Sequence, residues 1–189
     1  MLYVSTDYVF EGTGEKAFEV DDIPNPSNYY GLCKYQGEHM IREYLQNYFI
    51  VRTSWVFGIN GANFIKTMLR LGKEKPELNV VCDQIGSPTY TFDLAKVIVD
   101  MIISEKYGIY HATNEGYCSW YDFACAIFRL AKYNVKVNPV TTEQYVTAAK
   151  RPKNSRLSKK ALEENDFNKL PDWENALKRY LNELSLENI

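Results

Sequence analysis

Short apolar segments alternate with longer helical segments along most of this chain. Segments rich in β-branched and aromatic residues occur at 2–6, 48–58, 78–82 and 108–113. Between or after them, apolar residues recur with helical spacing near 28–46, 62–73, 91–104 and 119–132. Because the first two strands are continuous apolar runs, both of their faces are expected to be covered. This order predicts an α/β protein with a parallel sheet between layers of helices.

Polar residues stand where several of these helices are expected to begin. Ser27, Thr91 and Ser119 are predicted to accept hydrogen bonds from early helix amides. Asp122 completes the spacing of a capping box with Ser119. Beyond residue 134 the elements shorten to a strand-like KVNPV, a basic loop, and a last helix that is predicted to open at PDWENALKRYLNEL, residues 171–184.

Length and charge restrict the functions open to the chain. Its 189 residues suffice for one substantial domain, or for one domain and a fraction of another. A net charge of −2 argues against non-specific nucleic-acid binding. No apolar run reaches the roughly eighteen residues of a membrane span, and the start MLYVSTDYVF lacks the features of a secretory signal. We therefore expect a cytoplasmic protein without a nucleic-acid or membrane partner.

The cysteines and histidines predict reduced thiols and no metal site. The four cysteines form no CxxC pair, so reduced and buried thiols are expected. His39 and His111 stand far apart, without a cysteine or carboxylate at metal-ligand spacing. His111 ends a predicted strand and is interpreted as a structural histidine outside the site.

One glycine pattern could hold a dinucleotide pyrophosphate, but its surroundings argue against that role. Gly12, Gly14 and Ala17 match the spacing GxGxxA. A phosphate-binding turn must lead directly into a helix whose N-terminus faces the phosphates. Here FEVDDIPNP follows at 18–26, and its two prolines interrupt any helix. We expect an ordinary loop.

Tyr30 and Lys34 are candidates for a proton-delivering pair. With 15 tyrosines, about one Tyr-x-x-x-Lys spacing is expected by chance, so the spacing alone carries little weight. Positions i and i+4 share a helix face, however, and Thr6 and Asp7 end an apolar strand, where open α/β sheets expose functional groups. The alternative is two unrelated side chains on an amphipathic helix.

Reduction of a carbonyl group needs these three residue types. Hydride delivery leaves an oxyanion that must be protonated, and a phenol is a slow acid near neutrality unless an ammonium group assists it. Lys34 would supply that ammonium and hold the nicotinamide ribose. The hydroxyl of Thr6 would hydrogen-bond the carbonyl oxygen and fix its approach to Tyr30.

Seven segments in this order resemble the dTDP-4-dehydrorhamnose reductases, which are extended short-chain dehydrogenases/reductases. They are STDYVFEG, YYGLCKYQGE, VRTSWVFG, NFIKTM, DQIGSPTYTFDLA, GIYHATNEGYCSWYDFA and RPKNSRLS. The resemblance covers nearly the whole chain. It implies the C-terminal part of a doubly wound, Rossmann-like parallel sheet with a small α+β substrate-binding portion. Residues 1–58 would carry the catalytic group, and 59–189 would mainly bind substrate, with some elements returning to the sheet.

The resemblance also implies an activity and a site. The activity is reduction of the C4 ketone of dTDP-4-dehydro-6-deoxy-L-mannose to dTDP-L-rhamnose with NADPH or NADH. The catalytic residues would be Thr6, Tyr30 and Lys34, of which Tyr30 and Lys34 would also contact the cofactor. The thymidine-diphospho sugar would be bound by Thr6, Asp7, Trp55, Gln84, Pro88, Thr89, Arg151 and Arg156.

Several of these residues have a purely structural alternative. Trp55 could be a core aromatic, since aromatic side chains dominate buried area. The basic loop at 150–160, which contains Arg151 and Arg156, could be a solvated face, although guanidinium groups suit phosphate oxygens. The sequence GSPT at 86–89 is expected to form a turn in either case.

The chain also departs from the family that it resembles. Members carry a glycine-rich first turn and roughly a hundred residues before the STD strand, about three βαβ-sized units. Without them, the sheet is expected to have an unpaired edge that favours a homo-oligomer or a partner N-terminal segment. Two other functions stay open: a non-catalytic binding or regulatory module, and a sugar-nucleotide epimerase or dehydratase. Tyr8, where dehydratases often have glutamate, favours simple reduction.

Overall fold

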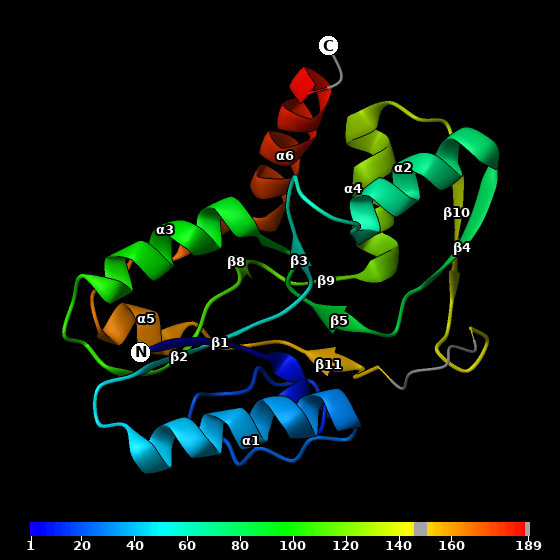
Figure 1. Ribbon diagram of the computed structural model, residues 1–189. Helices are drawn as coiled ribbons and strands as arrows, with labels where there is room; N and C mark the ends of the chain where they lie inside the picture. The colour runs from blue at the N-terminus through cyan, green and yellow to red at the C-terminus, as the bar shows by residue number, and fades with distance from the viewer. Residues whose placement is uncertain (146–150, 188–189) are drawn as a thin grey trace.

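A parallel three-stranded sheet organises the N-terminal part of the protein. The structure, a computed structural model, describes residues 1–145 and 151–187. Strands β1 (Leu2–Thr6), β2 (Phe49–Thr53) and β7 (Gly108–His111) lie side by side in the order β1-β2-β7, with all pairs parallel (Figure 1). The predicted α/β architecture with a parallel sheet is therefore confirmed.

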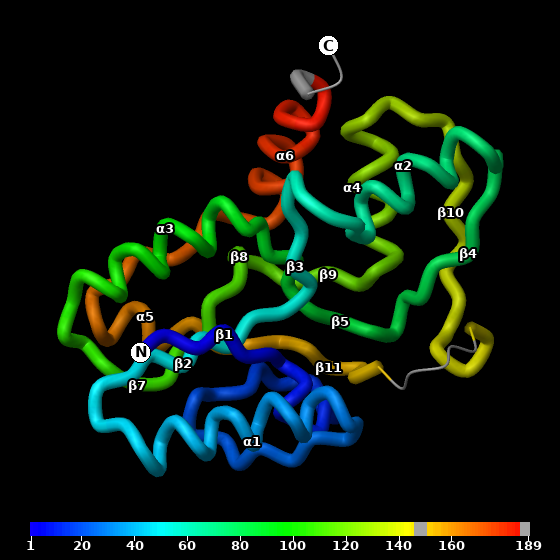
Figure 2. The backbone as a smooth tube through the Cα atoms, in the orientation of Figure 1, coloured from blue at the N-terminus to red at the C-terminus, as the bar shows by residue number. Residues whose placement is uncertain are grey.

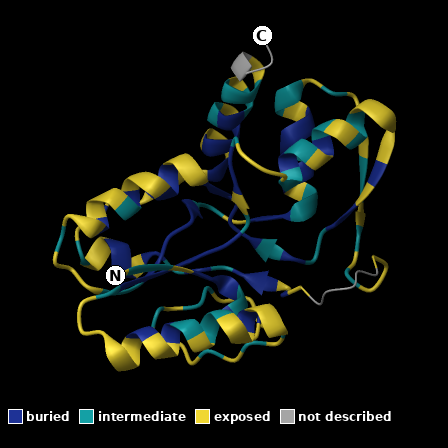
Figure 3. Cartoon of the chain, in the orientation of Figure 1, coloured by how far each residue is buried: buried dark blue, intermediate teal, exposed yellow. Residues whose placement is uncertain are grey.

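Helices cover both faces of this sheet. Helix α1 (Tyr29–Tyr44) lies along one face, and α3 (Thr91–Ile102) with the short α5 (Lys160–Glu164) lies on the other (Figure 1). Val51 packs with apolar residues of α3 and α5, whereas its neighbour Arg52 turns toward α1. Most of α1 is exposed on its outer side (Figure 3). Strand alternation thus gives the two helix layers different surfaces to pack on.

A second core lies between three helices and a two-stranded sheet. Helices α2 (Phe64–Glu74), α4 (Trp120–Ala131) and α6 (Trp173–Glu187) pack beside strands β4 (Glu77–Val81) and β10 (Lys136–Val140), which run parallel (Figure 2). All of these elements were expected from the sequence, with boundaries shifted by up to three residues. This second core stands next to the first sheet and supplies most of the aromatic residues near the candidate site.

Two pairs and one group of three very short strands connect the two regions. Strand β3 (Val56–Phe57) pairs with β6 (Thr89–Tyr90), and β8 (Asn114–Glu115) pairs with β12 (Leu170–Asp172). Strand β5 (Ile85–Gly86) lies between β11 (Asn154–Ser155) and β9 (Cys118–Ser119). The one-turn 3-10 helix η1 (Asp7–Val9) follows β1 directly. These strands bring segments far apart in sequence to one place.

One of the three predicted helix caps is confirmed. Ser119 accepts from the Asp122 amide at 3.0 Å, and the Asp122 carboxylate accepts from the Ser119 amide at 2.9 Å, which is the predicted capping box. The prediction for α1 was wrong by one residue, because Asn28, not Ser27, accepts from the Gly31 amide at 2.8 Å. Asparagine is as good a cap as serine, so the local sequence did not distinguish them.

The starts of α3 and α6 also differ from the predictions. Thr91 is the first residue of α3 rather than its cap, and Tyr90 before it makes no side-chain cap hydrogen bond. The Tyr90 amide instead donates to Asn114 Oδ1 at 2.8 Å, so a residue of β8 fixes the entry to the helix. Helix α6 opens at Trp173, not at 171, since 171–172 belong to β12.

The Gly12–Ala17 pattern forms a loop, as expected. No helix follows it; Phe18 makes a parallel bridge with Leu157. Gly12 has φ +76°, and a Cβ there would overlap Pro152. The loop is packed against the segment that precedes β11, with the Asn154 amide donating to the Gly12 carbonyl at 2.9 Å.

The thiols are free but mostly not buried. All four cysteines lack disulfides, and only Cys118 is buried; Cys33 is exposed and Cys82 and Cys125 are half-buried. The expectation of buried thiols was therefore wrong, because Cys33 falls on the outer side of α1. No helix among the described residues is both long and apolar enough to cross a membrane. Nor do three histidine, cysteine or carboxylate side chains gather at a point within residues 1–145 and 151–187.

The outer edge of β1 carries no partner strand among the described residues. Strand β1 pairs with β2 alone, and Val4 at its middle is 42% exposed. Strand β7, from the later part of the chain, lies on the other side of β2. The division at residue 58 stays a prediction, although β7 does return to the first sheet.

Candidate active site

Thr6 and Asp7 stand at the carboxyl end of β1, and both are buried. Thr6 caps the 3-10 turn η1: its Oγ1 accepts from the Tyr8 amide at 3.2 Å and donates to Asp7 Oδ1 at 3.1 Å. The strand ends here because this side-chain cap competes with the next ladder hydrogen bond. The result is a rigid hydroxyl and carboxyl pair at the strand end.

Asp7 is the most perturbed carboxyl group in this region. Burial raises the pKa of Asp7 from 3.8 to about 6, while the hydroxyls of Ser155 and Thr6 act in the opposite direction. Its Oδ2 atom makes no hydrogen bond of ordinary geometry with the described residues. A buried carboxyl oxygen without a partner is uncommon and points to a polar group that binds there.

Tyr30 lies beside this strand end, in the first turn of α1. Its ring meets the edge of the Tyr8 ring, with centroids 5.7 Å apart and planes at 82°. Gly31 makes this approach possible, since a Cβ at position 31 would overlap the Tyr8 carbonyl oxygen. Tyr30 is 54% exposed and thus open to a ligand. Tyr8 therefore links Tyr30 to Thr6 and Asp7.

Lys34 lies one turn further along α1 and faces the sheet. Its Nζ stands 4.0 Å above the ring of Tyr3 in β1, and it is half-buried. The hydroxyl of Tyr3 donates in turn to the Lys34 carbonyl at 3.4 Å. The structure thus places Thr6, Tyr30 and Lys34 along one junction between β1 and α1, and their role as one catalytic group stays a prediction.

Trp55 follows β2 and has a strained backbone. Its φ is +49°, a left-handed value that is uncommon for a large side chain. The Thr89 amide donates to the Trp55 carbonyl at 3.1 Å, and the Trp55 ring stacks on Trp120 with centroids 3.6 Å apart. A Cβ on Gly86 would lie 2.8 Å from the Trp55 ring. Such strain persists only where neighbours hold it, and it is typical of ligand sites.

Two adjoining hollows open beside the Trp55 and Trp120 rings. One, of about 360 Å³, is lined by both indoles and by Arg151; the other, of about 290 Å³, is lined by Trp120, Arg151 and Gln84. Arg151 also acts on Tyr8, where its charge partly offsets the burial that raises the pKa of the phenol. One guanidinium group therefore connects the hollows with the Thr6 end of β1.

The other predicted substrate residues take different positions. Gln84 donates from Nε2 to Thr142 Oγ1 at 3.2 Å at the rim of the smaller hollow. Pro88 and Thr89 are buried and line neither hollow; Thr89 pairs with Val56, and its amide donates to the Trp55 carbonyl. Arg156 donates to Asn154 Oδ1 at 3.0 Å and lies 5.9 Å from the Tyr117 ring centroid, and unlike Arg151 it lines neither hollow. Residue 150, at the start of the basic loop, lies outside the described residues.

Sequence reasoning missed three residues of the site. Trp120 stacks on Trp55, Ser155 acts on Asp7, and Tyr8 joins Asp7 to Tyr30. All three lie in segments that resemble the reductases, but only the fold shows their roles. Trp120 falls in the first turn of the helix predicted at 119–132, and its position there gave no signal of a role in the site.

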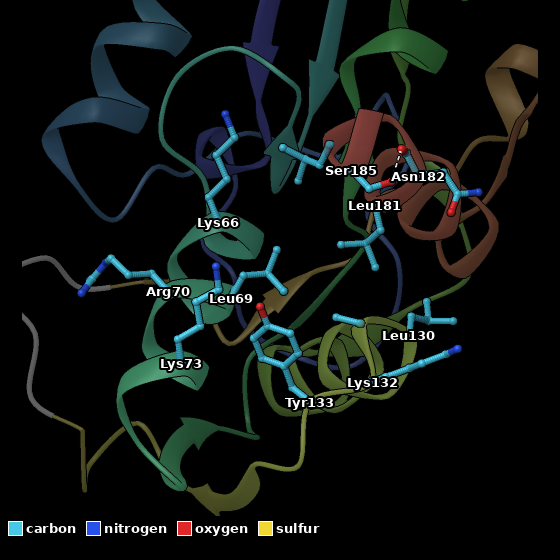
Figure 4. A pocket seen from close by; sticks show the side chains of 12 residues that line it. Lys66, Leu69, Arg70, Lys73, Leu130, Lys132, Tyr133, Leu181, Asn182 and Ser185 are labelled. Carbon is cyan, nitrogen blue, oxygen red and sulfur yellow. Dashed lines mark hydrogen bonds between the residues drawn. The ribbon is translucent and has the colours of Figure 1, made fainter. Parts of the chain in front are cut away.

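A larger groove lies elsewhere. It has a volume of about 950 Å³ and lies between α2, α4 and α6, where Leu69, Leu130 and Leu181 face basic residues such as Lys73 and Lys132 (Figure 4). None of the predicted site residues lines it. The clustering of buried polar groups marks the β1 end as the better candidate.

Comparison with known proteins agrees with this geometry. The family described as RmlD substrate binding domain matches residues 1–186. The chain belongs to this family. Among RmlD-family relatives, the spore coat polysaccharide biosynthesis protein SpsK of Bacillus subtilis (strain 168) is 46% identical over 97% of this chain and 64% of its own length. The dTDP-4-dehydrorhamnose reductase of Escherichia coli (strain K12) is 42% identical over 97% of this chain and 65% of its own.

A solved RmlD-family structure has the same fold. The dTDP-4-dehydrorhamnose reductase of Bacillus anthracis str. Ames, in complex with NADP, superposes with a TM-score of 0.93 at 48% identity. The match covers 96% of this chain and 65% of that one. The present chain thus spans just under two thirds of the length of the RmlD-family relatives that it matches. The Rossmann-like architecture is confirmed for the part that they share.

Proposed function

We propose that the chain carries the substrate pocket and acid–base group of a dTDP-4-dehydrorhamnose reductase. The reaction is reduction of the C4 ketone of dTDP-4-dehydro-6-deoxy-L-mannose to dTDP-L-rhamnose. The observation that carries the proposal is the junction of β1 and α1, which holds Thr6 and Tyr30 around Tyr8. Beside them lies a buried Asp7 oxygen that makes no hydrogen bond of ordinary geometry with the described residues. Relatives at 42% and higher identity that bear the reductase name support the same reading.

Each residue of the junction has a distinct role in this proposal. Tyr30 donates its phenolic proton to O4 of the sugar as the carbonyl is reduced. Thr6 donates a hydrogen bond to the same oxygen and fixes its approach. Lys34 places a positive charge beside the phenol. Asp7 accepts hydrogen bonds from sugar hydroxyls through the carboxyl oxygen that has no partner within the described part of the chain.

The hollows beside Trp55 suit the rest of a thymidine-diphospho sugar. The stacked indoles offer a flat apolar wall to the sugar or base, and Arg151 offers a planar cation to the diphosphate. Gln84 adds an amide at the rim of the smaller hollow. Arg156, Pro88 and Thr89 contribute only indirectly in this arrangement.

NADPH is the proposed cofactor, and the described residues fit one end of it. Tyr30 and Lys34, open at the start of α1, suit the nicotinamide ribose. The Gly12–Ala17 loop leads into no helix and so offers no pyrophosphate site. When bound, the cofactor supplies the hydride to C4. The crystallised relative in complex with NADP supports this choice over NADH.

Calorimetric titration of the 189-residue chain with dTDP-L-rhamnose tests the pocket. We expect saturable binding that weakens at least tenfold in Trp55→Ala, since loss of one stacked ring costs about 1.4 kcal/mol or more. A folded chain that binds no sugar nucleotide would contradict the proposed pocket.

Turnover tests the chemistry separately. With NADPH and the keto sugar, Tyr30→Phe is expected to lose most of kcat while it keeps sugar-nucleotide affinity. Near-normal turnover in Tyr30→Phe would exclude the phenol as proton donor. Binding without any turnover in the unaltered chain would favour the non-catalytic module instead.

The free edge of β1 supports a proposal about partners. Within residues 1–145 and 151–187 one edge of β1 has no partner strand, and Val4 is exposed there. Such an edge favours pairing with another strand, from a second copy or from a partner segment. Sedimentation of the isolated chain is expected to show self-association at micromolar concentration. A stable monomer that binds no hydrophobic dye would contradict it.

A further inference from the structure

A buried ion pair joins α1 to the middle strand of the first sheet. Arg52 of β2 donates from Nη2 to Glu38 Oε2 at 2.7 Å and from Nε to Oε1 at 3.0 Å. Both side chains are 1% exposed. This bidentate geometry fixes both the depth and the rotation of α1 on the sheet. The planar guanidinium group of Arg52 can donate two hydrogen bonds to a carboxylate in only a few orientations.

Two further side chains complete the group. Ser5 Oγ donates to Glu38 Oε1 at 2.5 Å, and Arg52 Nη1 lies 3.4 Å from His111 Nε2. Burial and the charge of Arg52 lower the pKa of His111 to about 3, so the imidazole is neutral and accepts from the guanidinium. We call Ser5, Glu38, Arg52 and His111 the Glu38–Arg52 cluster. It ties together β1, α1, β2 and β7.

The Glu38–Arg52 cluster shares its strand β1 and its helix α1 with the members of the proposed acid–base group. Ser5 immediately precedes Thr6 in β1. Glu38 follows Lys34 by one helical turn and Tyr30 by two, on the side of α1 that faces the sheet. Any shift of α1 along or around its axis that moved Tyr30 would therefore break hydrogen bonds of the cluster.

The energetics of buried ion pairs favour a role in positioning rather than in stability. Removal of one partner of such a pair is strongly destabilising, whereas replacement of both by apolar side chains is often neutral. A charged pair therefore confers little stability that apolar packing could not supply. Its best-attested advantage is the selection of one register.

We propose that Glu38 and Arg52 are positioning residues, which hold Tyr30 and Lys34 of α1 in register with Thr6 of β1. Neither touches the reacting atoms. The role of Tyr30, Lys34 and Thr6 as the groups that are positioned rests on the proposed function. The statement that Glu38 and Arg52 set the register of α1 on the sheet does not depend on it.

The test compares three variants of the 189-residue chain with the unaltered one. Glu38→Gln breaks the pair and keeps its shape, and the double variant Glu38→Met with Arg52→Met removes both charges. Glu74→Gln breaks the exposed pair with Arg70, at 3.1 Å, and serves as the matched control. For each, kcat and KM with NADPH and the keto sugar are measured together with Tm.

Positioning predicts that kcat and stability separate. Glu38→Gln is expected to lose roughly tenfold to a hundredfold in kcat with little change in the sugar KM, since small misplacements of reacting groups have effects of this size. The double variant is expected to regain Tm but not kcat. The Glu74→Gln control should match the unaltered chain in both. Recovery of kcat together with Tm in the double variant would overturn the proposal, because the cluster would then only stabilise.

A second readout keeps this test independent of the reaction. Absence of turnover in the unaltered chain would count against the proposed function alone. The contact between the Tyr8 and Tyr30 rings is then followed by nuclear Overhauser effects in the same variants. Its loss in the folded double variant, with the Trp55 to Trp120 contact kept, supports positioning. Retention of both contacts, or loss of both in a cooperatively folded variant, would overturn it.

Discussion

The indole of Trp55 stacks on that of Trp120, with ring centroids 3.6 Å apart and planes only 11° from parallel. The two residues are far apart in sequence, one after β2 and the other at the start of α4. Trp120 also packs against Phe64 of α2, with centroids 4.6 Å apart. This aromatic stack holds Trp55 in its left-handed backbone conformation and forms one wall of the proposed substrate pocket.

Loss of Trp120 should therefore weaken binding through Trp55. In Trp120→Ala the Trp55 ring loses its support, and we expect dTDP-L-rhamnose affinity to fall about tenfold or more, equivalent to about 1.4 kcal/mol. Calorimetry measures the affinity, with Tyr44→Ala, an exposed aromatic at the end of α1, as control. Unchanged affinity in Trp120→Ala would show that the stack does not shape the pocket.

Gly31→Ala is expected to destabilise the protein although alanine is the better helix former. The added methyl group would overlap the Tyr8 carbonyl oxygen, so the first turn of α1 must move away from η1. Against a gain of about 1 kcal/mol from helix propensity, overpacking of this kind costs roughly 1–3 kcal/mol. Urea denaturation should show a lower free energy of unfolding than for Cys33→Ala on the exposed side. If Gly31→Ala were as stable as the parent, the first turn of α1 could move away from the Tyr8 carbonyl without a measurable cost in stability.

Asp7 should make the protein less stable as the pH rises from about 4 to about 6. Its pKa is raised by burial from 3.8 to about 6, so the folded state binds the proton more tightly than the unfolded state. Its stabilising contribution is complete below 3.8 and is lost as the pH rises through 6. The free energy of unfolding of Asp7→Asn, measured relative to the parent, should increase by about 1.4 kcal/mol for each unit that the pH rises across this range. Denaturation at several pH values measures this, and a constant difference would contradict it.

His111 should have the opposite effect on the pH dependence of stability, over a pH range that overlaps that of Asp7. Burial lowers its pKa from 6.5 to about 3, so here the unfolded state binds the proton more tightly. Stability is therefore complete above 6.5 and falls as the pH decreases toward 3. The free energy of unfolding of His111→Gln, measured relative to the parent, should increase by about 1.4 kcal/mol for each unit that the pH falls below 6.5. If both variants showed the parent's pH profile, neither group would be coupled to folding.

Local pattern was sufficient for most of the architecture. The continuous apolar runs predicted the parallel strands β1 and β2, although only β2 is buried along its whole length and Val4 of β1 is exposed. Helical spacing predicted α1 to α4 within one or two residues of their ends. The prolines after Gly12 predicted the loop there. These features depend on neighbours in sequence, whose spacing directly determines which side chains share a face.

The two-residue strands and one helix entry were beyond such reasoning. Strands of two residues, such as β5 and β11, have no period to detect, and Asn114 fixes the start of α3 from a distant strand. The cap at Asn28 competed with an equally suitable Ser27. Trp120 and Ser155 lie in segments that resemble the reductases. Nothing in those segments indicated that Trp120 would contact Trp55 or that Ser155 would act on Asp7.

The sequence by itself determined the α/β order and the placement of Tyr30, Lys34 and Glu38 along one helix, since both follow from the repeat of a single element. Only the tertiary structure decided that Glu38 meets Arg52, that Trp55 meets Trp120, and that Arg151 but not Arg156 reaches the hollows. The physical reason is that such contacts depend on how separate elements pack. Packing is decided by burial and hydrogen bonding across the whole chain, which no local period encodes.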